Sequence, residues 1–271
     1  MMGQLHVSSA IIIIWVMGSF LAQWLPLDIN HIQLEAILKP PTLDNWFGYD
    51  DLGRPVFDRL LSGSYTSCVV ALTVILMSAC IGTIIGTLSA YLGGMFDQVI
   101  TRVIDIFLAF PGILLAIALA GIMGPGIDNV VIALSIVGWV GFARLARAQT
   151  LSVKHREHVV AAEVMGTGRA KIIFRHLIPL ISTPLLVEAT FGIASVVIAE
   201  AGLSFLGLGV QAPDASWGSM IRDGTRYMLV APHLVLIPGM ALMMVVLAVN
   251  LAGDRLRDRL DVKTQINENG V

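Results

Sequence analysis

Three carboxylates interrupt apolar stretches of this sequence, and their type and setting indicate contact with a solute inside a membrane. Glu188 and Glu200 lie within the run 177–208, and Asp105 lies at the edge of another apolar run, which Pro111 interrupts. An ionisable side chain in lipid is costly and commonly marks a pathway for substrate or ions. Proline removes a helical hydrogen bond and can open a helix toward such a pathway. We therefore expect these four residues to be candidates for the substrate pathway.

The three carboxylates are expected to have different roles. Glu188 and Glu200 are twelve positions apart, which places them about 120° apart around a helix, so they cannot share one narrow face. Glu188 is the better candidate for the pathway. A structural role at the end of its helix is favoured for Glu200, and Asp105 is expected to pair with Arg102 or with a neighbouring subunit.

The sequence carries no pattern of an enzyme. A phosphate-binding loop needs glycine directly before lysine, and the sequence contains no Gly-Lys pair. His155 and His158 could share a helix face beside Glu157, but a solvated face is a better interpretation than a metal site. No nucleophile turn of the Gly-x-Ser-x-Gly type occurs. We expect no catalytic residue, no metal and no cofactor in this chain, which could not hydrolyse ATP unaided.

The segment 158–179 has the pattern of a docking element. Helical periodicity continues to Met165, the sequence Gly-Thr-Gly at 166–168 breaks it, and a second helix is expected to start near Arg169 and to end before Pro179. Two short helices at an angle, with a stripe of small and apolar residues, could dock into a groove of a soluble partner. A loop that merely caps a helical bundle is the alternative.

The elements that must position these residues are membrane helices. The chain has 271 residues, of which 56% are apolar and only 13% charged, and its mean hydropathy is +0.82. A soluble domain carries about 25% charged residues, whereas a helix of about 20 apolar residues crosses a bilayer. The expected architecture is an all-α integral membrane domain of six helices. These helices are expected at about 7–25, 66–91, 105–124, 129–147, 178–206 and 230–252.

Basic residues predict the orientation of these helices. The loops on one side hold five Lys and Arg and the segments on the other side hold twelve, and the richer side is cytoplasmic by the positive-inside rule. Both termini are therefore expected in the cytoplasm. The segment 26–65 is then a periplasmic loop, 148–177 a cytoplasmic loop and 253–271 a cytoplasmic tail.

Small residues recur every fourth position in the second expected helix. They are Ser78, Gly82, Gly86 and Ala90. Small residues at this spacing let two helix backbones approach closely in a membrane. We expect this stripe to pack against another helix of the chain.

The segment 158–179 resembles the EAA loop of the membrane permeases of ABC importers, which has Glu-Ala-Ala, three residues, Gly, nine residues and Ile-x-Leu-Pro. The positions in register are Ala161, Ala162, Gly166 and Pro179. Val160 stands where the pattern has Glu, His176 where it has Ile, and Ile178 where it has Leu. The residues that the resemblance assigns to contact with an ATPase subunit are Val160, Ala161, Ala162, Glu163, Met165, Gly166, Arg169, Arg175 and Pro179.

Further segments resemble the C-type subunit of the dipeptide, oligopeptide and nickel permeases. They are 46–54, 59–63, 102–111, 200–209 and 253–258. Tyr49 stands where threonine is usual, and Pro55 where aspartate is usual. The resemblance implies the six-helix bundle of type I ABC importer permeases, with cytoplasmic coupling helices, in the inner membrane of a bacterium.

That resemblance also implies the partners of the chain. They are a B-type permease subunit, two cytoplasmic ATPase subunits that bind ATP and Mg, and a periplasmic or lipid-anchored solute-binding protein, without nucleic acid. The expected function is to form half of a pathway for small peptides. A nickel or metal-chelate importer of the same family is the alternative. An ATP-independent secondary transporter or channel would show inverted repeats, which we do not find, and an intramembrane enzyme or an assembly subunit is also less favoured.

Overall fold

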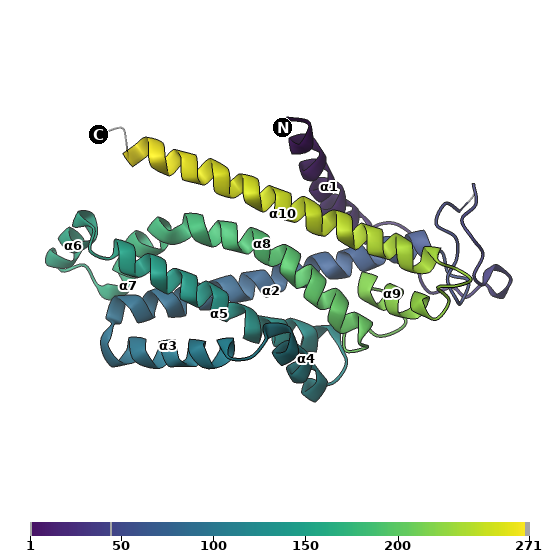
Figure 1. Cartoon of the computed structure of the whole chain (residues 1–271), viewed down its shortest axis with the longest axis horizontal. Helices are drawn as coiled ribbons and strands as arrows, with labels where there is room; N and C mark the ends of the chain where they lie inside the picture. The colour runs from purple at the N-terminus through teal and green to yellow at the C-terminus, as the bar shows by residue number, and fades with distance from the viewer. Residues whose placement is uncertain (1, 44, 269–271) are drawn as a thin grey trace. The chain divides into compact units, whose positions relative to one another are not determined.

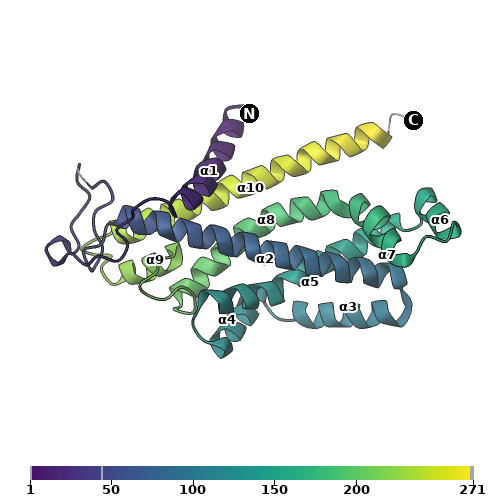
Figure 2. The same cartoon turned by 180° about the vertical axis from the view of Figure 1, so that it is seen from behind.

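The structure, a computed structural model, describes residues 2–43 and 45–268 (Figures 1 and 2). Within these residues the regular structure is helical, apart from an isolated bridge between Tyr49 and Pro55, so the predicted all-α class is confirmed. The elements are α1 (Met2–Leu21), a 3₁₀ turn η1 (Leu34–Ala36), α2 (Val56–Leu92), α3 (Gly94–Leu108), α4 (Gly112–Met123), α5 (Ile127–Val153), α6 (Glu157–Val164), α7 (Arg169–Ile172), a π-helical turn η2 (Ile173–Leu177), α8 (Ile178–Phe205), α9 (Trp217–Thr225) and α10 (His233–Glu268).

Internal contacts divide the chain into two compact units, and each is described by itself. The first unit comprises Met1–Thr73, Ile117–Leu134 and Ile193–Ala252. The second unit comprises Val74–Ala116, Ser135–Gly192 and Gly253–Val271. The end of the expected cytoplasmic tail, 269–271, lies outside the described residues.

Four helical stretches of the described residues are long and apolar enough to cross a membrane. They are Val56–Leu92, Ile127–Val153, Arg169–Phe205 and His233–Leu260. α3 and α4 give a fifth if together they form one span. The first expected helix, 7–25, is α1, which ends at Leu21; its 20 residues are roughly 30 Å long at 1.5 Å per residue, about the thickness of the hydrocarbon core.

The third expected helix, 105–124, is not continuous. α3 ends at Leu108, α4 begins at Gly112, and the two axes differ by 86°. Pro111 cannot donate a backbone hydrogen bond, and it disfavours helical backbone in the residue before it. The N–H of Ala109 still bonds the carbonyl of Asp105, so the break falls at the residues directly before Pro111.

Three of the expected spans are longer in the structure, and the last of them, α10, covers His233–Glu268 rather than 230–252, so that it includes most of the expected tail. α2 begins at Val56 rather than at 66, and α5 covers 127–153 rather than 129–147. The extension of α2 contains Arg59, and the last residue of the expected fourth helix is Arg147; each of these arginines has a carboxylate partner. Nε of Arg59 lies 3.3 Å from Asp50, and Arg147 lies 2.6 Å from Asp97. These ion pairs neutralise the two arginines within α2 and α5.

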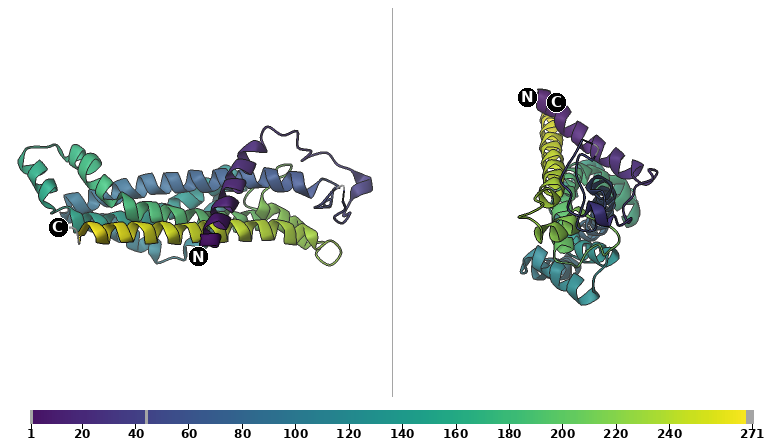
Figure 3. Two further views of the ribbon diagram at one scale, coloured as in Figure 1. Left: turned by 90° about the horizontal axis from the view of Figure 1, so that it is seen from above. Right: turned by 90° about the vertical axis from the view of Figure 1, so that its right-hand side faces the viewer.

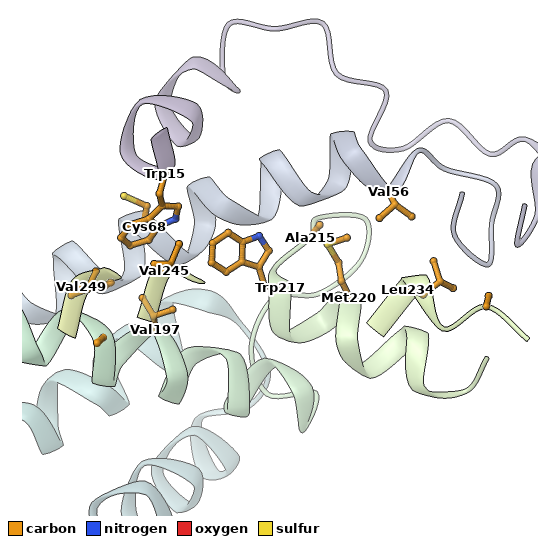
Figure 4. Packing of buried hydrophobic residues seen from close by; sticks show 13 residues of the cluster. Trp15, Val56, Cys68, Val197, Ala215, Trp217, Met220, Leu234, Val245 and Val249 are labelled. Atoms are coloured by element: carbon orange, nitrogen blue, oxygen red, sulfur yellow. The ribbon is translucent and has the colours of Figure 1, made fainter. Parts of the chain in front are cut away.

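The core of the first unit surrounds two indole rings (Figure 4). The ring centroids of Trp15 in α1 and Trp217 in α9 lie 6.4 Å apart, and Val197 of α8 and Val245 of α10 belong to the same buried cluster. The indole N–H of Trp217 donates to the carbonyl of Leu60 at 3.0 Å. Buried tryptophan is most stable where its N–H finds such a partner, so Trp217 ties α9 to the start of α2.

The second unit contains a close contact between two helix backbones. A β-carbon at Gly86 of α2 would lie against the carbonyl oxygen of Ala143 in α5 and 2.9 Å from the carbonyl carbon. At Gly82 it would lie 2.9 Å from the backbone nitrogen of Ala143. The predicted packing of the small-residue stripe is confirmed for these two glycines. α5 also packs through Val140 and Ala143 against Ile104 of α3.

Candidate coupling bend and translocation residues

The predicted break at 166–168 is a tight bend, which we name the coupling bend (residues 157–179; Figure 3). Gly166 has φ of +78°, a left-handed conformation that costs a residue with a β-carbon about 1–2 kcal/mol. Its N–H bonds the carbonyl of Glu163, and the N–H of Thr167 bonds the carbonyl of Ala162. These two bonds form the Schellman motif that ends a helix at glycine, so Gly166 ends α6 and turns the chain into α7.

The coupling bend presents most of its candidate residues to the surface. Val164 is 83% exposed and Met165 78% exposed, and Phe174 in η2 is also exposed. The exposed candidates are Val160, Ala161, Glu163, Met165, Gly166, Arg169, Arg175 and Pro179, whereas Ala162 is buried. Large exposed apolar side chains beside small ones are typical of a docking surface.

The second helix of the bend does not end before Pro179, and that expectation is wrong. α7 passes through the π-helical turn η2 directly into α8. Pro179 lacks the N–H that would bond the carbonyl of Arg175 in a regular helix, and a π-helical turn accommodates such a local mismatch. α8 therefore continues from the bend without a loop.

Buried side chains join α6 to α8 within the second unit. Val159 of α6 packs in one cluster with Ile172, Leu177 and Ile181, and all four are almost fully buried. Native interiors are close-packed and transmit displacement with little compression. A displacement of α6 therefore acts directly on the start of α8.

Glu200 lies in the interior of the first unit. Its side chain has no exposed surface, and its two carboxyl oxygens accept hydrogen bonds from Ser67 at 2.9 Å and from Ser204 at 2.7 Å. Ser67 belongs to α2, so the carboxyl group joins α8 to α2. This arrangement holds the two helices together, and in this structure the carboxyl group does not reach the surface.

The two hydroxyl bonds of Glu200 predict a graded effect on stability. Glu200→Gln keeps an acceptor in place and should change the free energy of unfolding by less than about 1 kcal/mol, whereas Glu200→Leu removes the acceptor of both hydroxyl protons and should cost about 1–3 kcal/mol. Thermal unfolding of the purified protein in detergent measures both variants. Equal unfolding temperatures for the Gln and Leu variants would contradict the assigned role.

Glu188 has a different setting in the second unit. Its side chain is exposed on α8, and one carboxyl oxygen lies 3.6 Å from the place that a β-carbon of Gly141 would occupy. Among the described residues it has no ion-pair partner. Pro111 is exposed at the α3–α4 break. Asp105 is also exposed, and it lies 3.9 Å from Arg102, the partner that was expected for it.

The segment 46–54, which resembles the C-type permease subunits, forms a compact turn in the first unit. One oxygen of Asp50 accepts the N–H groups of Leu52 and Arg54, at 2.9 and 2.8 Å. The other accepts from Nε of Arg54 at 2.8 Å and lies 3.3 Å from Arg59. Burial, followed by the neighbouring Asp50 carboxylate, raises the pKa of Asp51 above its ordinary value. This cluster fixes the loop to α2, so its residues have a structural role.

The sequence analysis did not identify the pair of Asp97 and Arg147. Nε and Nη2 of Arg147 donate to the two oxygens of Asp97, each at 2.6 Å, and Ser89 donates to Oδ1 of the same carboxylate at 2.6 Å. The pair joins α3 to α5 across fifty positions of sequence. No local periodicity signals a contact at that separation, and only the unlike charges beside apolar runs hinted at it.

Comparison with known proteins identifies the family of the chain. Residues 82–265 match the sequence profile of the "Binding-protein-dependent transport system inner membrane component" family. The dipeptide transport system permease protein of Alkalihalophilus pseudofirmus is 42% identical over 83% of this chain and 74% of its own length. The glutathione transport system permease protein of Escherichia coli is 39% identical over 93% of this chain and 84% of its own length.

A structural comparison supports the same fold. A chain of the MetNI methionine ABC transporter, solved in inward-facing conformations, superimposes with a TM-score of 0.61 at 18% identity, and the match covers 75% of this chain and 97% of that chain. The fold is therefore that of ABC importer permeases, as predicted. Together with the profile match over most of the chain, this likeness shows that the protein belongs to the family of inner membrane components of binding-protein-dependent transport systems.

Proposed function

We propose that this permease forms half of the translocation pathway for short peptides, and that a B-type permease subunit forms the other half. The observation that carries the proposal is the exposed coupling bend around Gly166, in a chain whose relatives transport a dipeptide and glutathione. Both of those solutes contain peptide bonds and carry charged termini. The substrate class follows from this shared chemistry.

The coupling bend is the proposed contact with one of two cytoplasmic ATPase subunits, which bind ATP and Mg. Val164, Met165 and Phe174 supply apolar area, and Ala161 and Gly166 let a partner approach the backbone closely. Arg169 and Arg175 lie at the surface of the same element. A short helix with exposed apolar side chains of this kind fits a groove on the partner, and the buried contact of Val159 with α8 passes the movement on.

This assignment sets the orientation of the chain in the bacterial inner membrane. The coupling bend and both termini lie in the cytoplasm, and the segment 26–65 lies in the periplasm, as the distribution of basic residues favours. A periplasmic or lipid-anchored binding protein delivers the peptide to the periplasmic side. No ATP site is needed in this chain because the partner subunits supply the energy.

Transport by the reconstituted complex tests the proposed function. The complete transporter is placed in proteoliposomes with its binding protein, and ATP-driven uptake of labelled dipeptide, glutathione and Ni²⁺ is compared. ATP-dependent uptake of a peptide, with loss of uptake when this subunit is omitted, is the expected result. Uptake of Ni²⁺ in preference to every peptide, or transport by this subunit alone, would contradict it.

Glu188 is the residue that we propose to face the passing peptide. It is an exposed carboxylate in a membrane helix, without an ion-pair partner in residues 2–43 and 45–268, and it can attract the ammonium group at the N-terminus of a peptide. A charged hydrogen bond is worth about 1.5–3 kcal/mol, and part of that value is lost where water competes. We therefore expect Glu188→Gln to lower uptake at subsaturating peptide by about tenfold. Initial rates in the proteoliposome assay measure the effect.

Glu35→Gln is the matched control, because it removes the same charge from an exposed position outside the membrane helices. Its uptake should equal that of the unchanged protein. An N-acetylated peptide lacks the ammonium group, so its transport should not depend on the residue at 188. Unchanged uptake of every peptide by the Glu188→Gln variant would remove Glu188 from the pathway.

A further inference from the structure

The second unit contains an open polar cavity that the transport function does not use. Its volume is about 270 Å³, and it lies between α3 and α5. The lining residues are Asp97, Gln98, Thr101, Arg102 and Arg147. Drug-sized ligands occupy pockets of about 300–1,000 Å³, so this cavity suits a small charged group rather than a whole large ligand.

Asp97 is the carboxylate among these lining residues, and it already has hydrogen-bond partners. Both oxygens of Asp97 accept from Arg147, and Oδ1 also accepts from Ser89. The hydroxyl of Thr101 donates to the backbone carbonyl of Asp97 at 2.8 Å. The Asp97–Arg147 pair is therefore neutral as a unit, and Nη1 of Arg147 has no hydrogen bond to any of the described residues.

Arg102 supplies a positive charge at the mouth of the cavity. Its side chain is 84% exposed, and its nearest carboxylate, Asp105, lies at 3.9 Å on the surface of the same helix. An exposed contact of this length holds a guanidinium group weakly. Arg102, the remaining N–H groups of Arg147 and the Gln98 amide can together donate to an anion. Phosphate oxygens are strong acceptors for such a set of donors.

Beside Gln98 and Asp105, the face of α3 that carries Arg102 also carries exposed apolar side chains. Met95, Val99 and Ile106 are spaced at seven, three and four positions from Arg102, so they share its face of the helix, and they are 82%, 56% and 61% exposed. An arginine next to exposed apolar side chains is typical of the level where lipid headgroups meet the hydrocarbon region. The apolar side chains beside the cavity therefore suit an acyl chain. A free anion would make no use of apolar contacts.

We propose that this cavity binds the phosphate group of an anionic phospholipid. Arg102 and Arg147 contact the phosphate, and Ile106, one turn further into the expected membrane span, contacts the adjoining acyl chain. A bound lipid would fill the space between α3 and α5 beside the Asp97–Arg147 pair. Inorganic phosphate has the same charged group without the acyl chain, so it is the alternative that the experiment separates.

Native mass spectrometry of the complete transporter in detergent tests this site. Phosphatidylglycerol, phosphatidylcholine and inorganic phosphate are titrated separately. We expect preferential retention of phosphatidylglycerol, and about fivefold weaker retention in the Arg102→Gln variant, since one basic residue near an anionic lipid contributes about 1 kcal/mol. Asp105→Asn removes the competing carboxylate and should strengthen retention about twofold or more.

Arg226→Gln is the matched control, because Arg226 is an exposed arginine outside this cavity. Its retention of phosphatidylglycerol should equal that of the unchanged protein. Equal effects of Arg102→Gln and Arg226→Gln, or equal retention of phosphatidylcholine, would overturn the proposal. Displacement of the lipid by millimolar inorganic phosphate would also overturn it, because the site would then recognise a soluble anion.

Discussion

Replacing Gly166 with tryptophan should abolish ATP-driven uptake while the protein still accumulates in the membrane. A β-carbon at this position meets no atom within 4 Å in the described part of the chain, so the side chain has room in the isolated subunit. The backbone, with φ of +78°, costs a residue other than glycine about 1–2 kcal/mol. The added indole ring would occupy the surface that we propose to contact the ATPase. We expect uptake to fall more than tenfold, and ATP hydrolysis to lose its dependence on peptide.

Gly124→Trp controls for strain and bulk together. Gly124 also has a positive φ, of +88°, and open space around its β-carbon position, but it lies in the turn between α4 and α5 rather than in the coupling bend. That variant should retain uptake in proportion to the amount of folded protein. Uptake by the Gly166→Trp variant at the level of the unchanged protein would show that the bend is not the contact with the ATPase.

Structural features that depend on neighbouring residues in the sequence were predicted well. The bend at Gly166 follows from a helical pattern that stops at glycine, and glycine after the last turn is the usual end of a helix. The apolar runs likewise predicted the central parts of α2, α5, α8 and α10. In each case the information lies within a few residues of the feature, so neighbouring residues are sufficient to find it.

Features that depend on distant partners were predicted less well. The apolar runs misplaced the start of α2, where Asp50 neutralises Arg59, and they gave no sign that Asp97 pairs with Arg147 of α5. The role of Glu200 was predicted to be structural, but its partner Ser67 lies 133 positions away. A single sequence gives no signal for such a pair, since hydrogen bonding and burial depend on the tertiary fold.

The break at Pro111 lies between these two cases. Its position was evident from the sequence, since proline removes a hydrogen bond, but the angle was not. Gly112 has Val137 of α5 as its neighbour, and Ile104 and Phe107 fix the end of α3 against α5. The 86° bend is therefore set by what each helix packs against, which the local sequence does not contain.

Replacing Gly86 with leucine should remove folded protein from the membrane. A β-carbon at this position would lie 2.9 Å from the carbonyl carbon and 3.0 Å from the Cα of Ala143. These are backbone atoms of α5, so relief requires the two helices to separate. Overpacking costs about 1–3 kcal/mol and sometimes more. We expect Gly86→Ala to lower the unfolding temperature and Gly86→Leu to leave no monodisperse peak in size-exclusion chromatography.

Gly121→Ala is the control that isolates packing from helix propensity. Gly121 lies within α4 and has no atom near its β-carbon position in the described residues. Alanine is favoured over glycine within a helix by about 1 kcal/mol, so this variant should be neutral or slightly more stable. Gly86→Ala gains the same propensity, and its net loss of stability therefore measures the cost of separating α2 from α5. If both alanine variants raised the unfolding temperature equally, the close contact between the two backbones would not exist, and the spacing of small residues in α2 would have no structural role.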